Sequence, residues 1–299
     1  MNIIVGLGGY LTWTAIAREI RKKYGKNIKL LPVEQHGSFY KFLYNHKDIE
    51  VFKDNEDFCL SYNLGSLNNN FILPLVLNNP NANYCKKDTP TKAFHRTDKH
   101  IIEQVCELYD ITDPALKCYL QPQAEDWWFK EKIGDWFGVS LSIHQDPPPF
   151  ITIEPNSKIN YTPNRVYPFE KWQNIVDALK DKIPFVQVGT EGSRVLDNVI
   201  DWTGQSTFKN TAGMIGYSRL FLSTEGGLVH AATAVDTKSV VIITGYQSEK
   251  MIAYPQNINI NIATHGPCGL KTVCPDCKRD AENHDWRDIV SLIEKELCL

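Results

Sequence analysis

The sequence lacks a strong excess of charge of either sign and lacks any long apolar run. Its 32 lysines and arginines stand against 35 aspartates and glutamates, giving a net charge of −3. No basic field for a nucleic acid is therefore predicted. Apolar stretches such as Val240–Ile243 fall far short of the roughly twenty residues that a membrane-spanning helix needs. We expect no nucleic-acid partner and no transmembrane segment, while contact with a membrane surface stays open.

The sequence also lacks a recognisable targeting segment and internal repeats. The first residues read MNIIVGLGG, without a positively charged stretch before an apolar core, so we expect no secretory signal and a cytoplasmic chain with reduced thiols. Of its 299 residues, 42% are hydrophobic and 22% charged, which is ordinary for a globular protein of about two domains. A chain of this length can fold without a disulfide or a metal ion.

Strands and helices alternate in the pattern, which predicts an α/β fold with parallel sheets. In the first half we predict strands at residues 3–5, 28–33 and 50–52 and helices at residues 12–24, 39–44, 98–109 and 127–137, the last with its aromatic side chains in the core. In the second half we predict strands at residues 150–154, 185–188, 220–222 and 239–243 and helices at residues 170–180, near 195, at 228–234 and at 285–297.

Three consecutive prolines form the strongest break in the chain. Pro147, Pro148 and Pro149 cannot continue a helix and favour an extended link. We place a domain boundary there, which gives domains at residues 1–146 and 150–284 and a C-terminal helix within residues 285–299. Two α/β domains joined in this way leave a cleft, and ligands of such folds bind at the carboxyl ends of the strands.

Two glycine-rich segments lie where a strand is predicted to meet a helix. Gly8 and Gly9 follow the first strand, and we expect a tight turn that faces the cleft, although the spacing departs from the dinucleotide fingerprint. Gly226 and Gly227 follow the strand at residues 220–222, and their free amides at a helix N-terminus suit phosphate oxygens. His230 is one helical turn further on and is predicted to face the same place.

Four segments together resemble glycosyltransferase family 9, the heptosyltransferases of lipopolysaccharide assembly. Residues 225–232, EGGLVHAA, are similar to the family's D-[TS]-G-x-x-H-x-A loop. Residues 164–172, NRVYPFEKW, are similar to its K-x-W-P-x-x-x-[FW] segment, and residues 186–191 to its strand that ends in G-x-E. Residues 8–14, GGYLTWT, stand where the family has G-D-x-L-x-x-T. Order and spacing agree over nearly the whole chain.

The resemblance implies a GT-B architecture, in which two Rossmann-like domains with parallel sheets flank a central cleft. It implies an inverting glycosyltransferase that moves a sugar from a nucleoside-diphosphate donor to a glycan, lipid-linked or protein acceptor, without a metal in the transfer step. Arg165 and His230 would be catalytic, Arg165 by neutralising the diphosphate. The donor would be held by Gly8, Gly9, Asn156, Ser157, Glu191, Glu225, Gly226, Gly227 and Leu228, with Asn156 and Ser157 on phosphate oxygens and Glu191 on the ribose or base.

One departure from the family pattern concerns the general base. The family has an aspartate after the first-loop glycine, and this chain has Gly9, which cannot accept a proton. Glu34, His36 or His95 could serve instead, the acceptor could react without this base, or the protein could bind a nucleotide-sugar without transferring it. A non-catalytic binding protein is therefore the alternative hypothesis, and another GT-B enzyme such as a sugar epimerase is a third.

The eight cysteines include one group with the spacing of a metal site. His265, Cys268, Cys274 and Cys277 carry the imidazole and thiolate ligands that suit tetrahedral zinc or iron, and Pro275 with Asp276 is predicted to form a tight turn between the last two cysteines. Family relatives with a cysteine-bound iron support this interpretation, whereas a reduced loop without metal is the alternative. The remaining cysteines, predicted to be ordinary small apolar residues, are Cys59, Cys85, Cys106, Cys118 and Cys298.

Overall fold

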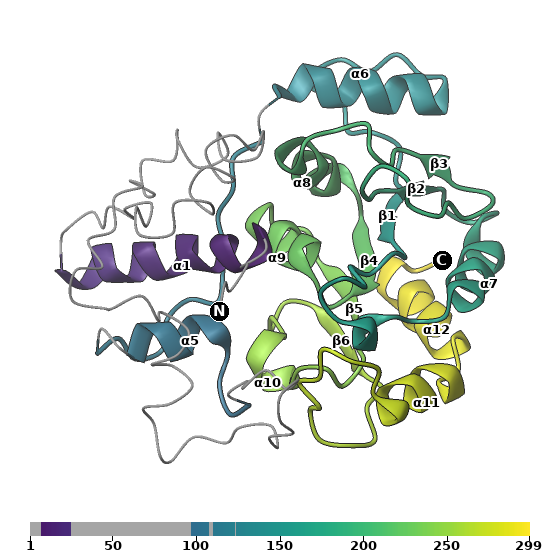
Figure 1. Ribbon diagram of the computed structural model, residues 1–299. Helices are drawn as coiled ribbons and strands as arrows, with labels where there is room; N and C mark the ends of the chain where they lie inside the picture. Colours follow the sequence, from purple (N-terminus) through teal and green to yellow (C-terminus); the bar gives the residue numbers. More distant parts are fainter. Residues whose placement is uncertain (1–6, 25–96, 108–109, 123) are drawn as a thin grey trace.

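The computed structural model describes residues 7–24, 97–107, 110–122 and 124–299 (Figure 1). The strands predicted at residues 3–5, 28–33 and 50–52 and the helix predicted at residues 39–44 lie outside this part of the chain. So do the candidate bases Glu34, His36 and His95. In the part described, no helix is both long and apolar enough to cross a membrane.

The second half of the chain forms a parallel sheet of six strands. The strands are β1 (Ile151–Glu154), β2 (Phe185–Gln187), β3 (Ile200–Asp201), β4 (Leu220–Thr224), β5 (Ser239–Ile243) and β6 (Ile258–Asn261). Their order in the sheet is β3-β2-β1-β4-β5-β6, and every neighbouring pair is parallel. This is the doubly wound order, in which ligands bind beyond the carboxyl ends of the two central strands. Those strands are β1 and β4.

Helices cover both faces of the sheet (Figure 1). This is required because successive apolar side chains of the strands point to opposite faces, and both faces must be buried. Ile153 and Leu222 face the layer of α7 (Phe169–Leu179) and α12 (Arg287–Leu297). Val186 and Phe221 face the opposite core, which includes side chains of α8 (Phe208–Tyr217) and α9 (Gly227–Ala234). The two cores hold the strand ends, and therefore the loops after them, in fixed positions.

Helix α6 (Asp126–Phe137) precedes the three prolines and packs on the second-half sheet domain. The Phe129 ring lies so close to Gly213 of α8 that a Cβ at Gly213 would be 2.2 Å from its Cζ atom. Phe129 and Ile133 are buried, as predicted for this helix, but Trp127 is 57% exposed, so the prediction was wrong for that side chain. The domain boundary at residues 146–149 stays a prediction.

The N-terminal helix α1 (Leu7–Tyr24) begins earlier than the sequence indicated. Gly8 and Gly9 lie in its first turn rather than in a turn that precedes it, so the predicted glycine turn is wrong in form. The helix lies between α9 and α5 (Ile101–Cys106), whose start is capped by His100 (Figure 1). Its N-terminal end meets the N-terminal end of α9.

Two further local predictions differ from the structure, and some elements were missed. The helix expected near Val195 is absent, because the chain turns at Gly189 and Gly192, which both have positive φ, before it enters β3. The tight turn expected at Pro275 is the start of α11 (Pro275–Asn283), with proline in the first helical turn. The helices α8 and α10 (Glu249–Ile252) and the short strands β3 and β6 were not predicted at all.

Candidate functional site

The candidate site lies at the carboxyl ends of β1 and β4, where the strand order reverses. Glu154 is the last residue of β1, and Glu225 follows directly after β4. Gly226 is the N-cap of α9, and it has no side chain to occupy the first amides of the helix. Those amides and the positive end of the helix dipole are suited to an anion.

Arg165 comes to this place from a short 3-10 helix, η4 (Pro163–Arg165). Its Nη2 atom donates a hydrogen bond to the side-chain oxygen of Gln247. Its Nε atom lies 4.0 Å from a carboxylate oxygen of Glu225 and has no hydrogen-bond partner. The guanidinium carbon is 5.1 Å from the ring centre of Tyr161 and 4.9 Å from that of Tyr246. The arginine is therefore held in place, and its Nε–H group remains available to bind a ligand.

The carboxylate beside Arg165 is only a partial counter-charge. Glu225 is 4% exposed and is held by Thr244, whose hydroxyl lies 2.9 Å and whose amide lies 3.3 Å from its two oxygens. Burial raises the pKa of Glu225 to about 7, although the Arg165 charge and these hydrogen bonds oppose the rise. Burial likewise raises the pKa of Glu154 to about 8. Near neutral pH the site therefore carries a surplus of positive charge.

Asn164 fixes the segment of Arg165 to a distant loop. Its side-chain amide donates to the carbonyl oxygens of Leu270 and Thr272, at 2.9 and 2.8 Å, and its oxygen accepts from the amide of Cys274 at 2.7 Å. Thr162 adds a bond of 2.9 Å to the Leu270 carbonyl. Because Asn164 is 5% exposed, losing these bonds would leave buried polar groups without partners.

Asn156 and Ser157 lie in the loop after β1, but their side chains bind protein groups. The Asn156 amide donates to the carbonyl of Arg194 at 2.8 Å, which ties this loop to the one after β2. The Ser157 hydroxyl donates to the Arg165 carbonyl at 2.7 Å and lies 2.9 Å from the hydroxyl of Thr224. Ser157 thus connects the ends of β1 and β4 with Arg165.

His230 lies one turn into α9, as the sequence indicated. Its Nδ1 atom is 2.6 Å from the hydroxyl of Tyr254, which is also 3.2 Å from the thiol of Cys118. Burial, together with the Arg165 charge, lowers the pKa of His230 to about 4, so the ring is neutral near pH 7. Burial raises the pKa of Tyr254 well above its ordinary value, so this phenol keeps its proton.

The first turn of α1 touches the start of α9. A Cβ on Gly8 would lie 2.6 Å from the Cα of Gly227 and 2.8 Å from Cδ2 of His230. Only glycine at position 8 permits this approach. The positive ends of the α1 and α9 dipoles therefore meet beside His230.

The predicted site residues divide into two groups. Gly8, Gly9, Ser157, Arg165, Glu225, Gly226, Gly227 and His230 gather at this region, and Leu228 is buried beneath it. Glu191 is exposed in the turn after β2, beside Gly204, and no described contact joins it to Arg165. Asn156 lies in the same loop after β1 as Ser157, but its side chain donates to the Arg194 carbonyl.

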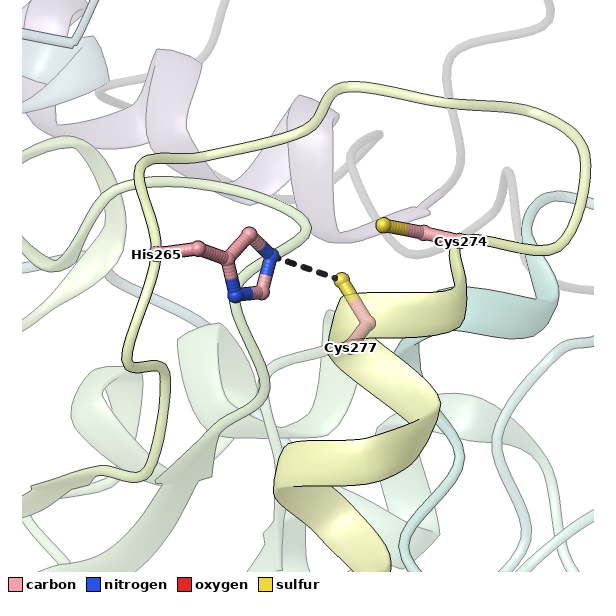
Figure 2. A group of neighbouring side chains, drawn as sticks. All are labelled: His265, Cys274 and Cys277. Carbon is pink, nitrogen blue, oxygen red and sulfur yellow. Dashed lines mark hydrogen bonds between the residues drawn. The ribbon is translucent and has the colours of Figure 1, made fainter.

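The cysteine–histidine cluster lies next to Asn164, whose side-chain oxygen accepts from the amide of Cys274. One ligand atom from each of His265, Cys274 and Cys277 lies within 4.8 Å of the others (Figure 2). The Nε2 atom of His265 is 3.4 Å from the Cys277 sulfur, along the dashed line of Figure 2. Cys268 brings its sulfur to 3.5 Å from that of Cys277, too far for a disulfide. The structure therefore brings all four predicted ligands together.

The surroundings of this cluster fit a metal ion. The Nδ1 atom of His265 lies 3.0 Å from the carboxylate of Asp280, which also accepts from the amide and hydroxyl of Thr264. A carboxylate behind the ring keeps the proton on Nδ1 and leaves Nε2 to bind metal. The three cysteine side chains are almost fully buried. Three thiols and one imidazole are a ligand set for tetrahedral zinc or iron.

Several residues of these two sites were missed by the sequence reasoning. Tyr161, Tyr246 and Lys271 surround Arg165, and Gln247 binds it. Thr244, Tyr254 and Asp280 support the predicted residues Glu225, His230 and His265. Glu154 could have been found, because a carboxylate that ends a buried strand is unusual. The aromatic and lysine contacts depend on tertiary packing and left no signal in the spacing.

No family model and no curated protein matches the sequence. Among solved structures, the chain is similar to TibC, a dodecameric iron-containing heptosyltransferase of enterotoxigenic E. coli solved with ADP-D-β-D-heptose. That alignment has a TM-score of 0.62 and 12% identity, and it covers 98% of this chain and 74% of the other. The E. coli ADP-heptose lipopolysaccharide heptosyltransferase II matches with a TM-score of 0.50 and 14% identity, over 67% of this chain.

The alignment with heptosyltransferase II spans 62% of the length of that enzyme, which is less than two thirds. At identities of 12 and 14% the likeness concerns the fold. It confirms the α/β class with GT-B architecture, and with it the resemblance to glycosyltransferase family 9 in structure. A GT-B fold has two Rossmann-like halves. The described residues contain one of them in full, the half with the parallel sheet and its switch point.

Proposed function

We propose that the chain is a glycosyltransferase that takes its sugar from a nucleoside-diphosphate donor. The observation that carries the proposal is the meeting of Arg165, His230 and the N-terminus of α9 at the switch point of the parallel sheet. A fold likeness to TibC over nearly the whole chain supports it. The acceptor is a glycan, a lipid-linked saccharide or a protein.

The chemistry of the departing diphosphate accounts for each of these groups. When the bond between sugar and phosphate breaks, negative charge develops on the phosphate oxygens and must be stabilised. Arg165 offers a fixed planar cation, and the amides of Gly227 and Leu228 offer hydrogen bonds at the positive end of α9. No metal ion is required for this step. Attack from the face opposite the diphosphate gives inversion.

His230 acts as a neutral hydrogen-bond donor in this scheme. Tyr254 keeps its proton and lies 2.6 Å from Nδ1 of His230. An imidazole nitrogen accepts a hydrogen bond better than a thiol sulfur does, so we assign the Tyr254 proton to Nδ1. The histidine proton is then on Nε2, where it can be donated to a phosphate oxygen. His230 stabilises the leaving group and does not act as the base.

The first donor to test is ADP-heptose, because TibC was solved with that compound. Heat denaturation should be followed with ADP, GDP, UDP and CDP, and transfer should be followed with a matching panel of nucleotide-sugars by mass spectrometry. At least one nucleoside diphosphate should raise the melting temperature. Arg165→Ala should weaken its binding about a hundredfold, as expected for the loss of a charged hydrogen bond in a buried site.

The control for that substitution is Arg287→Ala. Arg287 is exposed on α12 and pairs with Asp285, so its loss removes the same charge away from the site. Binding by Arg287→Ala should match the unchanged protein. If none of the nucleoside diphosphates shifts the melting temperature, the proposed function is wrong.

The second candidate is a nucleotide-sugar-binding protein that carries out no transfer. Position 9, where the resembling family has its presumed base, is a glycine in the first turn of α1. That turn packs on Gly227 and His230. A protein of this kind would bind the donor and leave it intact, with neither transfer nor hydrolysis across the acceptor panel. A glycosyltransferase would release nucleoside diphosphate with at least one acceptor.

We further propose that His265, Cys268, Cys274 and Cys277 hold a structural zinc or iron ion. The geometry of the cluster and the carboxylate behind His265 support this. The ion would join the loop of residues 265–274 to α11. Metal analysis of protein purified without a histidine tag should give about one ion per chain, and a stoichiometric absence of both metals would refute the site.

A further inference from the structure

Lys271 lies in the segment between Cys268 and Cys274 and reaches toward Arg165. Its Nζ atom is 3.2 Å from the ring centre of Tyr161 and donates to the hydroxyl of Tyr246 at 3.0 Å. These are the same two rings that flank the guanidinium of Arg165. We call Tyr161, Arg165, Tyr246 and Lys271 the cation–tyrosine cluster.

We propose that Lys271 is a second cation for the diphosphate of the donor, brought beside Arg165 by the cysteine–histidine loop. The inference rests on the proposed function, because it names a further ligand of the same bound group. It also assigns the loop a role beyond metal binding. The loop brings the positive charge of Lys271 to the candidate site at the ends of β1 and β4.

The charges in the cluster favour an anion over a closed internal network. Arg165 and Lys271 both contact the two tyrosine rings, and Glu225 is the carboxylate within 4.0 Å of Arg165. In the described part of the chain, Lys271 has no carboxylate partner. Burial lowers the pKa of Lys271, the neighbouring Tyr161 phenol opposes this, and the Arg165 charge lowers it further. A bound diphosphate would relieve the repulsion between the two cations.

The loop is rigid enough to set the position of Lys271. Asn164 binds the carbonyls of Leu270 and Thr272, the two neighbours of Lys271 in the chain. The same Asn164 precedes Arg165, so one side chain fixes the backbone of both cations. Cys268 and Cys274 anchor the two ends of the segment in the cluster. The distance between the two cations is therefore set by the fold.

A structural role gives a different expectation. A lysine can lay its methylene groups on an aromatic ring and leave its ammonium group in water, in which case its charge contributes to packing alone. Lys271→Met keeps the apolar stem over Tyr161 and removes the charge. Lys271→Arg keeps the charge. Comparing these two variants therefore distinguishes a role of Lys271 in anion binding from a role in packing on the Tyr161 ring.

The test is calorimetric titration of the intact protein, with its metal content measured, against inorganic pyrophosphate and, in parallel, against ADP. Pyrophosphate reports on the cations without help from a base or sugar. We expect Lys271→Met to weaken pyrophosphate binding about tenfold or more and to reduce its dependence on salt. Lys271→Arg should stay within about threefold of the unchanged protein. Melting temperature and metal content should be the same in all of them.

The matched control is Lys278→Ala, which removes a lysine from α11 beside Cys277. Lys278 is exposed and pairs with Glu282 at 3.7 Å, so its loss should leave binding unchanged. The inference is overturned if Lys271→Met binds like the unchanged protein, or if Lys271→Met and Lys271→Arg are weakened equally. These outcomes are distinct from failure of the proposed function, which is judged on the unchanged protein by its binding of nucleoside diphosphates and by sugar transfer.

Discussion

The cation–tyrosine cluster and the cysteine–histidine cluster lie next to each other and differ in the charge of the carboxylate that lies beside each. In the cysteine–histidine cluster the histidine has a full carboxylate behind it, since hydrogen bonds from Thr264 and His265 help to lower the pKa of Asp280 although burial opposes this. In the cation–tyrosine cluster the carboxylate beside Arg165 is Glu225, whose pKa burial raises to about 7. Under the proposed function, the first cluster would hold its ion permanently, and the second would leave positive charge for a diphosphate that binds and is released.

The two clusters also differ in how the chain builds them. The cysteine–histidine cluster comes from one stretch of sequence, residues 265–277, so its spacing is visible without a structure. The cation–tyrosine cluster combines residues from η4 and the segment before it, from the loop after β5 and from the loop before α11. Asn164 joins the two. The comparison therefore predicts which substitutions affect one cluster and which affect both.

The largest effect is expected from Cys277→Ser. Cys277 is almost fully buried, and its sulfur contacts both Cys268 and His265. If the cluster holds a structural ion, its loss should remove several kcal/mol of folding free energy and lower the melting temperature by about 10 °C or more. Metal analysis and thermal denaturation check this. Cys298→Ser, at an exposed cysteine, is the control and should change neither. Equal melting temperatures for the two variants would contradict a structural ion.

Asn164→Ala should come next, because it breaks the connection between the clusters. Three backbone groups would lose their partner, at a cost of about 3 kcal/mol. We expect chemical denaturation to show lower stability and calorimetry to show weaker pyrophosphate binding. Asn156→Ala removes one bond to a backbone carbonyl and serves as the control. Weaker stability with unchanged pyrophosphate affinity would mean that Asn164 supports the fold and does not set the cations.

An effect of similar size, but visible only as a function of pH, is expected from Glu225→Gln. The folded pKa of Glu225, about 7, lies above its ordinary value of 4.5, so the folded state binds the extra proton between those values. This stabilisation is complete below about pH 4.5 and is lost as the pH rises through 7, a change of about 3 kcal/mol. Glutamine cannot ionise, so the variant should gain stability relative to the unchanged protein between pH 5 and 8.

Urea denaturation at several pH values measures that difference directly. Glu154 is present in both proteins, so its own raised pKa cancels in the comparison. The loss of the contact with Arg165 adds an offset, and the test is the slope with pH. A difference in stability that stays constant from pH 5 to 8 would show that Glu225 is ionised throughout, and the surplus of positive charge would be smaller than described.

Much of the second-half fold could be predicted from the sequence, for a simple physical reason. Strands such as β4 and β5 are buried on both faces and read as continuous apolar runs. The edge strand β6 alternates asparagine with isoleucine and was missed. Pro275 was read as part of a tight turn, although a proline without an amide hydrogen is also favoured in the first turn of a helix.

The candidate site was predictable only where its residues lie in one segment. The loop from Glu225 to His230 and the four proposed metal ligands could be found because their spacing is local. Tyr161, Tyr246 and Lys271 could not be found, because each is defined by a partner far away in the chain. The role of Asn156 on a phosphate oxygen stays a prediction, because its side chain donates to a protein carbonyl in this structure.

The most direct test of the account is a crystal structure of the protein with a bound nucleoside diphosphate. The account predicts its β-phosphate within hydrogen-bond reach of Arg165 and of the first amides of α9, with Lys271 on the same phosphate group. A diphosphate bound elsewhere, with Arg165 still held by Gln247 and Glu225 alone, would contradict it.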